Sequence, residues 1–221
     1  MKLAEIKPID RLNFSTYKLR NIWEEYNFYA LMLENSLNDF KKELNKPDKK
    51  AFILVGPPRS GKTSLIHKYL QPRIRNLKII DSDDISLKFT KDPNLYKSGS
   101  YDIAKNYAEA FLSKIEKDVH SFVFDSTGRN ISRLERIANL SRNAKFKVIV
   151  LHVISNLEDA LERNEKTDRK VNPLYLINIH EISKKAYKEI YNRIMPDKYF
   201  VVYNSNEKQV WYEYDGVKIK R

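Results

Sequence analysis

The stretch from residue 56 to residue 63 reads GPPRSGKT, which is a glycine, four residues of any type, a glycine, a lysine and a threonine. This spacing is typical of a P-loop, in which glycines let the chain curl so that backbone N–H groups face phosphate oxygens. The apolar run AFILV precedes the loop and the helical pattern SLIHKYL follows it, so the helix N-terminus adds a favourable dipole. The predicted ATP-binding residues are Gly56, Pro57, Pro58, Arg59, Ser60, Gly61, Lys62, Thr63 and Ser64.

Two of these residues have predicted chemical roles beyond binding. Lys62 is expected to reach the terminal phosphates of ATP, and the Thr63 hydroxyl is expected to ligate Mg²⁺. A P-loop does not name the reaction, because switches, motors and small kinases all use one.

Three acids follow the second apolar run in the segment IIDSDDI, namely Asp81, Asp83 and Asp84. They are expected at the carboxyl end of a strand, where open α/β sheets bind their ligands. A carboxylate at that place can take the proton from an acceptor hydroxyl as a general base. Acids also cap helices and end turns, so we assign the base to Asp83 and expect structural roles for the other two.

The segment FVFDSTGRN places Asp125 at the end of a buried strand, in the position of a Walker B acid. Asp125 is predicted to order Mg²⁺ or to hold the acceptor, and Thr127 and Arg129 are predicted to bind an anionic group of the substrate. The alternative is a plain turn from strand to helix, capped by Asn130 or Ser132.

A polar segment, LERNEKTDRKVNP, is predicted to form a lid at about residues 163–173. Such a lid folds over the nucleotide and delivers an arginine to the transferred phosphoryl group. Arg163 and Arg169 are the candidates. A solvated helix end is the alternative interpretation.

These residues need a scaffold, and short apolar runs alternate with helical periods from residue 51 onward. The pattern predicts an α/β P-loop NTPase fold with a mostly parallel five-stranded sheet sandwiched by helices. Helices are expected at 62–70, 101–117, 131–142, 157–164 and, as one long element, 174–195. Near the end, QVWYEYDGVKIKR indicates a C-terminal hairpin.

Before the P-loop, apolar residues three or four apart predict one amphipathic helix at about 15–44. The charged connector around Pro47 then divides the chain into a helical extension at 1–48 and a kinase domain at 49–221. This helix is expected to pack on the core, with self-association or capture of an inhibitory partner as alternatives.

Composition narrows the class of protein. The net charge of +12 is spread along the chain, apart from residues 129–147, where six basic residues meet one acid, so anionic partners are favoured. The chain has no cysteine, which excludes disulfides and thiolate chemistry, and its four histidines lack metal-ligand spacing. No apolar run could span a membrane and the N-terminus lacks a secretory pattern, so we expect a cytoplasmic protein without membrane partners.

In their order along the chain, GPPRSGKTSL, IDSDDI, VFDSTGRN and the arginine-bearing lid resemble the P-loop kinases that include zeta toxins and phage polynucleotide 5′-kinases. The resemblance covers roughly residues 50–203. It implies kinase activity, with Asp83 as base, Lys62 as phosphate clamp, and lid arginines at Arg163 and Arg169. It also implies an antitoxin-like protein partner.

The chain departs from both branches of this family. SLKFTKDP stands where zeta toxins carry a Lys and a His-Pro, Asp125 stands where they carry a Glu, and Ser86 stands where the polynucleotide kinases carry an Arg. The leading hypothesis is a kinase that uses ATP and Mg²⁺ to phosphorylate a hydroxyl of a small anionic acceptor such as a nucleotide sugar. The alternatives are a polynucleotide 5′-hydroxyl kinase and a nucleotide-binding switch without catalysis.

Overall fold

A computed structural model describes residues 35–81, 110, 121–168, 170–206, 208–216 and 219–220. Its centre is a seven-stranded sheet in the order β2-β3-β1-β4-β5-β6-β7. The first five strands in this order run parallel, and β6 and β7 are antiparallel to their neighbours. The strands are β1 (Lys50–Val55), β2 (Lys78–Asp81), β3 (Ser121–Ser126), β4 (Lys147–Ile154), β5 (Lys198–Asn204), β6 (Gln209–Tyr214) and β7 (Ile219–Lys220).

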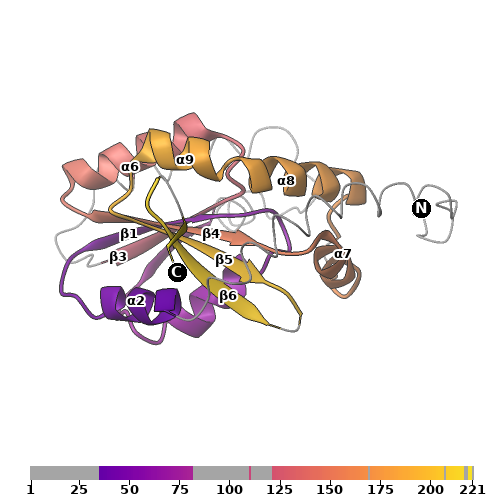
Figure 1. The fold of residues 1–221 in the computed structure, drawn as a ribbon, viewed down its shortest axis with the longest axis horizontal. Helices are drawn as coiled ribbons and strands as arrows, with labels where there is room; N and C mark the ends of the chain where they lie inside the picture. Colours follow the sequence, from indigo (N-terminus) through magenta and orange to yellow (C-terminus); the bar gives the residue numbers. More distant parts are fainter. Residues whose placement is uncertain are drawn as a thin grey trace, which may run out of the picture.

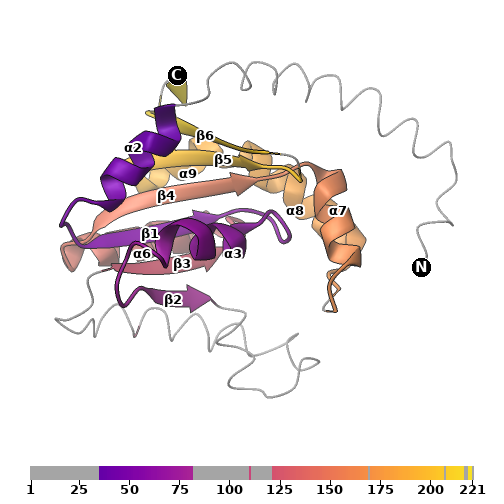
Figure 2. The same ribbon diagram turned by 90° about the horizontal axis from the view of Figure 1, so that it is seen from below.

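Helices cover both faces of the sheet (Figures 1 and 2). One face carries α6 and α9, and the other carries α2, α3 and the π-helical turn η2. The helices are α2 (Asn35–Leu44), α3 (Lys62–Leu65), η2 (Ile66–Leu70), α6 (Ile131–Asn143), α7 (Leu157–Glu165), α8 (Pro173–Lys185) and α9 (Tyr187–Ile194). Within the ranges that the structure describes, no helix combines the length and the apolar character that a bilayer crossing needs.

The two central strands explain why two layers are required. Every residue of β1 is buried, and β4 is buried at all but its two end residues. Strands that are apolar on both sides must be covered on both sides, which accounts for one hydrophobic cluster on each face of the sheet. The carboxyl ends of β1, β3 and β4 lie side by side at one end of the sheet, because the three strands pair in parallel.

The helix α2 joins the second of these clusters through its apolar face. Phe40 is fully buried and stacks on Trp211 of β6, with ring centroids 4.6 Å apart. It also meets Phe200 of β5 edge to face at 5.3 Å. The described part of the predicted helix at 15–44 is thus bound to the C-terminal strands, and the residues before 35 lie outside the description.

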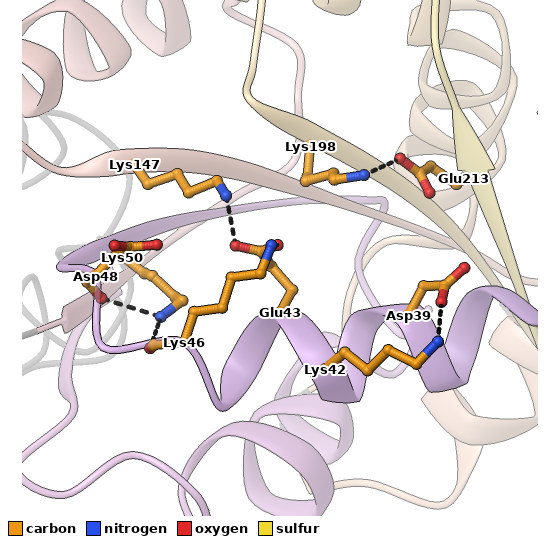
Figure 3. A network of polar contacts seen from close by, with 9 residues as sticks. All are labelled: Asp39, Lys42, Glu43, Lys46, Asp48, Lys50, Lys147, Lys198 and Glu213. Atoms are coloured by element: carbon orange, nitrogen blue, oxygen red, sulfur yellow. Dashed lines mark hydrogen bonds and ion pairs between the residues drawn. The ribbon is translucent and has the colours of Figure 1, made fainter.

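A charged network fixes the C-terminal end of α2 to the sheet (Figure 3). Glu43 is only 2% exposed and binds Lys147 of β4 and Lys46, both at 2.7 Å. Burial by itself would raise the pKa of Glu43, but the hydrogen bonds from the two lysines outweigh burial and lower that pKa. Lys50, at the start of β1, donates from Nζ to the carbonyls of Lys46 and Asp48 at 2.5 and 3.0 Å.

The predicted fold class is confirmed: the five predicted strands form the parallel part of the sheet, and β6 and β7 extend the described sheet to seven strands. The C-terminal hairpin is confirmed too, since β6 pairs antiparallel with β5 and with β7. The single helix predicted at 174–195 is wrong, because Ala186 separates α8 from α9 and its N–H bonds to Ser183 three residues back. This tighter turn lets α8 pack on β4 and α7 while α9 packs on α6. The helix predicted at 101–117 lies outside the described residues except for Ala110, which is helical.

Candidate functional site

The P-loop joins the end of β1 to the start of α3, as its sequence requires. Arg59 and Gly61 both adopt left-handed backbone conformations, with φ of 66° and 94°. A Cβ on Gly56 would lie 2.2 Å from the Val153 carbonyl oxygen, so only glycine fits there. The loop therefore has the alternating backbone geometry that aims N–H groups at an anion.

Lys62 lies inside this loop beside a carboxylate. Its Nζ donates to the carbonyls of Gly56 and Pro57 at 2.8 and 3.1 Å and lies 3.7 Å from Asp125 Oδ1. Asp125 comes from β3, whose register sets it opposite Leu54 of β1. Both charged side chains are 11% exposed, so the pair is largely removed from solvent.

The residues of the loop fit ATP and Mg²⁺. The Ser60 hydroxyl is fully buried and makes no hydrogen bond within the described structure, as expected of a polar group reserved for a ligand. Thr63 stands in the first turn of α3 with an exposed side chain. Its hydroxyl and the Asp125 carboxylate are oxygen donors of the kind that Mg²⁺ prefers. Of the other predicted binding residues, Pro57 is buried, Pro58 is half-buried and Ser64 is exposed.

The acidic cluster after β2 is described only in part. Asp81 ends β2 and pairs in register with Asp125 at the end of β3, so two carboxylates lie at the same edge of the sheet. Asp83, the predicted base, lies outside the described residues, two positions after Asp81, and Asp84 does as well.

The predicted lid begins in a helix. Arg163 belongs to α7, and its guanidinium donates to the Arg59 carbonyl at 3.0 Å, to the Asn204 carbonyl at 3.3 Å and to Asn206 Oδ1 at 3.0 Å. It therefore lies against the P-loop backbone and the turn after β5. Arg169 lies outside the described residues.

A cavity of about 920 Å³ opens where β3 leads into α6. It is lined by the turn that holds Thr127 and Arg129 and by α8 and α9, which contribute Tyr175, Lys185 and Glu189. The lining thus combines cationic, polar and aromatic groups, which suits an acceptor with an anionic part and a flat or apolar part. The predicted alternative for this turn is also realised, because Asn130 Oδ1 caps α6 by accepting from Arg133 N at 3.0 Å.

The basic residues of the segment 129–147 do not share one surface. Arg133 is 9% exposed and lies over the Phe124 ring, with its guanidinium carbon 5.2 Å from the ring centroid. Arg142 donates to the Ile194 and Met195 carbonyls, and Lys147 binds Glu43. Each of these three cations thus has a structural contact. Helical spacing could not predict these contacts, because they depend on which strands and helices pack beside each residue.

Sequence reasoning missed two asparagines at this site. Asn204 Nδ2 donates to the Ser60 carbonyl at 2.8 Å, and Asn164 Oδ1 accepts from Arg59 Nε at 3.2 Å. Asn204 stands in the run YNSNEK at the carboxyl end of the last parallel strand, and in open α/β sheets this end of the strands is where ligands bind. Asn164 has no comparable signal, because it looks like an ordinary residue of a polar helix end.

Comparison with known families and proteins agrees with this geometry. The model of the AAA domain family AAA_33 matches residues 52–173. The zeta toxin of Streptococcus pyogenes is 28% identical over 155 residues, which are 63% of this chain and 54% of the toxin. The zeta toxin of Enterococcus hirae is 29% identical over 154 residues, with similar coverage. The chain spans about half the length of these curated relatives, and the predicted resemblance to zeta toxins is confirmed.

Solved structures support the fold. A structure described as AvrRxo1-ORF1:-ORF2 with ATP has a TM-score of 0.59 at 15% identity. The superposition covers 91% of this chain and 67% of the chain in that structure. A structure of the PezAT chromosomal toxin-antitoxin system of Streptococcus pneumoniae has a TM-score of 0.54 at 15% identity. The superposition covers 81% of this chain and 79% of the chain in that structure. At this identity the likeness concerns the arrangement of strands and helices.

Proposed function

Because the chain belongs to the AAA domain family and carries a P-loop of complete sequence, we propose that it is an ATP-dependent phosphotransferase. It moves the γ-phosphate of ATP to a hydroxyl of a small anionic acceptor such as a nucleotide sugar. The observation that carries the proposal is the ion pair between Lys62 and Asp125. Asp125 directly precedes Ser126, the first of the residues at the end of β3 that line the cavity. In this proposal the phosphate site and the acceptor site are neighbours at the end of β3.

In the proposed reaction, the acceptor hydroxyl gives its proton to the Asp83 carboxylate and its oxygen forms a bond with the γ-phosphorus. The bond from that phosphorus to the bridging oxygen breaks, and ADP leaves with the electron pair. Lys62 exchanges its carbonyl partners for phosphate oxygens and stabilises their charge. Mg²⁺ bound with ATP would neutralise further charge, with Thr63 and Asp125 as the oxygen ligands. Arg169 is the lid residue proposed to contact the transferred group.

The acceptor is proposed to bind in the cavity beside Thr127 and Arg129. Arg129 and Lys185 supply positive charge for an anionic part, and Tyr175 supplies a ring against which a base or sugar can lie. A small acceptor is favoured over a polynucleotide because Arg133, Arg142 and Lys147 contact other groups of the protein. They are therefore not arranged as a track for a phosphate backbone.

The test is transfer of label from γ-labelled ATP with Mg²⁺ to a panel of nucleotide sugars and, in parallel, to a 5′-hydroxyl oligonucleotide. Label on a nucleotide sugar supports the proposal, and label on the oligonucleotide only would replace it by the polynucleotide alternative. The Asp83→Asn variant should bind ATP nearly as the wild type does and transfer nothing. ATP binding without transfer to any acceptor would favour a nucleotide-binding switch.

The resemblance to zeta toxins extends the proposal to an antitoxin-like protein partner. A chain of this kind should arrest growth when it is expressed alone in bacteria, because it would consume an acceptor that the cell needs. The Asp83→Asn variant should not arrest growth. Equal growth of cells that express the two forms to the same level would count against the toxin interpretation.

A further inference from the structure

The P-loop contains a conformation that its own sequence does not favour. Arg59 has a φ of 66°, a left-handed value that residues with a side chain rarely adopt. Such a residue stays in that region only where its surroundings hold it. The contacts that hold the loop therefore affect its ability to bind phosphate.

Three side chains from outside the loop contact it at consecutive residues. Arg163 donates to the Arg59 carbonyl at 3.0 Å, and Asn204 donates to the Ser60 carbonyl at 2.8 Å. Asn164 accepts from Arg59 Nε at 3.2 Å. We name Arg163, Asn164 and Asn204 the P-loop clamp.

The clamp determines where the N–H groups of the loop point. In a planar trans peptide the carbonyl of Ser60 and the N–H of Gly61 point in opposite directions. Because Asn204 holds that carbonyl on its own side, the Gly61 N–H is turned away from Asn204. A Cβ on Gly61 would lie 2.0 Å from Asn204 Nδ2, so the amide occupies the space that the glycine leaves.

Asn164 also ties the loop to the chain that enters α8. It is 1% exposed, its Nδ2 donates to the Val171 carbonyl at 2.8 Å, and its Oδ1 accepts from Val171 N at 2.9 Å. The same Oδ1 accepts from Arg59. One buried amide thus joins the P-loop to the segment 170–172.

The helix that carries Arg163 and Asn164 is itself anchored. Asn206, in the turn after β5, donates from its N–H to Asp159 Oδ2 at 3.1 Å and from Nδ2 to Glu162 Oε2 at 2.8 Å, and it accepts from Arg163 Nε at 3.0 Å. Arg163 and Asn164, on α7, and Asn204, at the end of β5, are therefore all held at the carboxyl end of β5.

We infer that Arg163, Asn164 and Asn204 are positioning residues that hold the P-loop in its phosphate-binding conformation, and that Asn164 couples this conformation to residues 170–172. The inference rests on the proposed function only in taking the P-loop as the nucleotide site. In this inference Arg163 supports the loop and does not itself contact the transferred phosphoryl group. Nucleotide binding and the position of the lid are then linked through one side chain.

The experiment compares the wild type with Asn164→Ala and Asn204→Ala in two assays that need no acceptor. Calorimetry measures the Kd of a non-hydrolysable ATP analogue with Mg²⁺, and amide hydrogen exchange follows residues 170–172 with and without the analogue. Glu158→Ala, an exposed position on the same helix, is the matched control. Both clamp variants should bind the analogue about tenfold more weakly or worse, since each loses a hydrogen bond that orients the loop.

The exchange assay separates coupling from a merely structural role. The analogue should slow exchange at residues 170–172 in the wild type and in Asn204→Ala, but not in Asn164→Ala. Wild-type affinity in both clamp variants, or unchanged slowing in Asn164→Ala, would overturn the inference. If Asn164→Ala does not fold by circular dichroism, Asn204→Ala decides, and wild-type affinity in that variant alone refutes the clamp. If the variants behave as expected in both assays but the wild type transfers no label to any acceptor, the kinase proposal is refuted and the clamp stands.

Discussion

Acidification is expected to destabilise this fold through His152, which is 1% exposed within β4. Its Nδ1 lies 2.7 Å from the Tyr199 hydroxyl and its Nε2 lies 3.2 Å from Ser183 Oγ. Burial, with a smaller contribution from the charge of Lys62, lowers the pKa of His152 from 6.5 to about 4. The neutral imidazole therefore joins β4, β5 and α8 one strand away from the P-loop, and Val55 is its partner in register on β1.

The size and sign of the effect follow from this pKa. Above pH 6.5, the unfolded-state value, the imidazole is neutral in both states and its full contribution is present. As the pH falls toward about 4, the unfolded chain binds a proton that the folded protein excludes, so the free energy of unfolding decreases. A shift from 6.5 to about 4 corresponds to about 3 kcal/mol at roughly 1.4 kcal/mol per pH unit. That is a large part of the 5–15 kcal/mol, roughly, by which domains are stable.

Urea unfolding of the wild type and of His152→Gln, at several values between about pH 7.5 and about pH 4, measures this contribution. The variant is less stable at neutral pH because glutamine fits the site less well, but it lacks the titrating group. The stability difference between the two proteins should therefore shrink by about 3 kcal/mol as the pH falls. A difference that stays constant over this range would refute the assignment of the pH dependence to His152.

Two of the three further predictions concern the P-loop and the acid beside it, and the third concerns the charged network at the end of α2. Gly61→Ala places a Cβ 2.0 Å from Asn204 Nδ2 at a φ of 94°, so the Kd for ATP should rise at least about tenfold in calorimetry, whereas an unchanged Kd would mean that the loop does not bind phosphate in this conformation. Asp125→Asn removes the carboxylate 3.7 Å from Lys62, so the rate of label transfer should fall about a hundredfold or more while the urea midpoint changes little; a wild-type rate would exclude Asp125 from the reaction. Glu43→Gln leaves two lysines without their buried carboxylate, so the free energy of unfolding by urea at pH 7 should fall by about 1–2 kcal/mol with ATP binding unaffected. Equal stability of the variant and the wild type would show that the network in Figure 3 does not stabilise the fold.

The spacing of residues along the sequence was sufficient to predict the elements whose structure depends on neighbouring residues of the chain. The strands β1, β3 and β4 each contain a run of at least three consecutive apolar residues, and the P-loop pattern begins directly after the apolar run of β1 and ends in the first turn of α3. The break at Ala186 was missed because no glycine or proline marks it. It comes from packing, since α8 and α9 follow different neighbours.

The candidate site divides in the same way. The sequence by itself determined the P-loop, the acid at the end of β3 and the family resemblance, because these are patterns of adjacent residues with a fixed chemical use. Only the tertiary structure decided that Lys62 faces Asp125 and that Asn164 and Asn204 reach Arg59 and Ser60, across 105 and 144 positions of the chain. Such contacts follow from the order of strands in the sheet, and strand order is set by the packing of the whole chain.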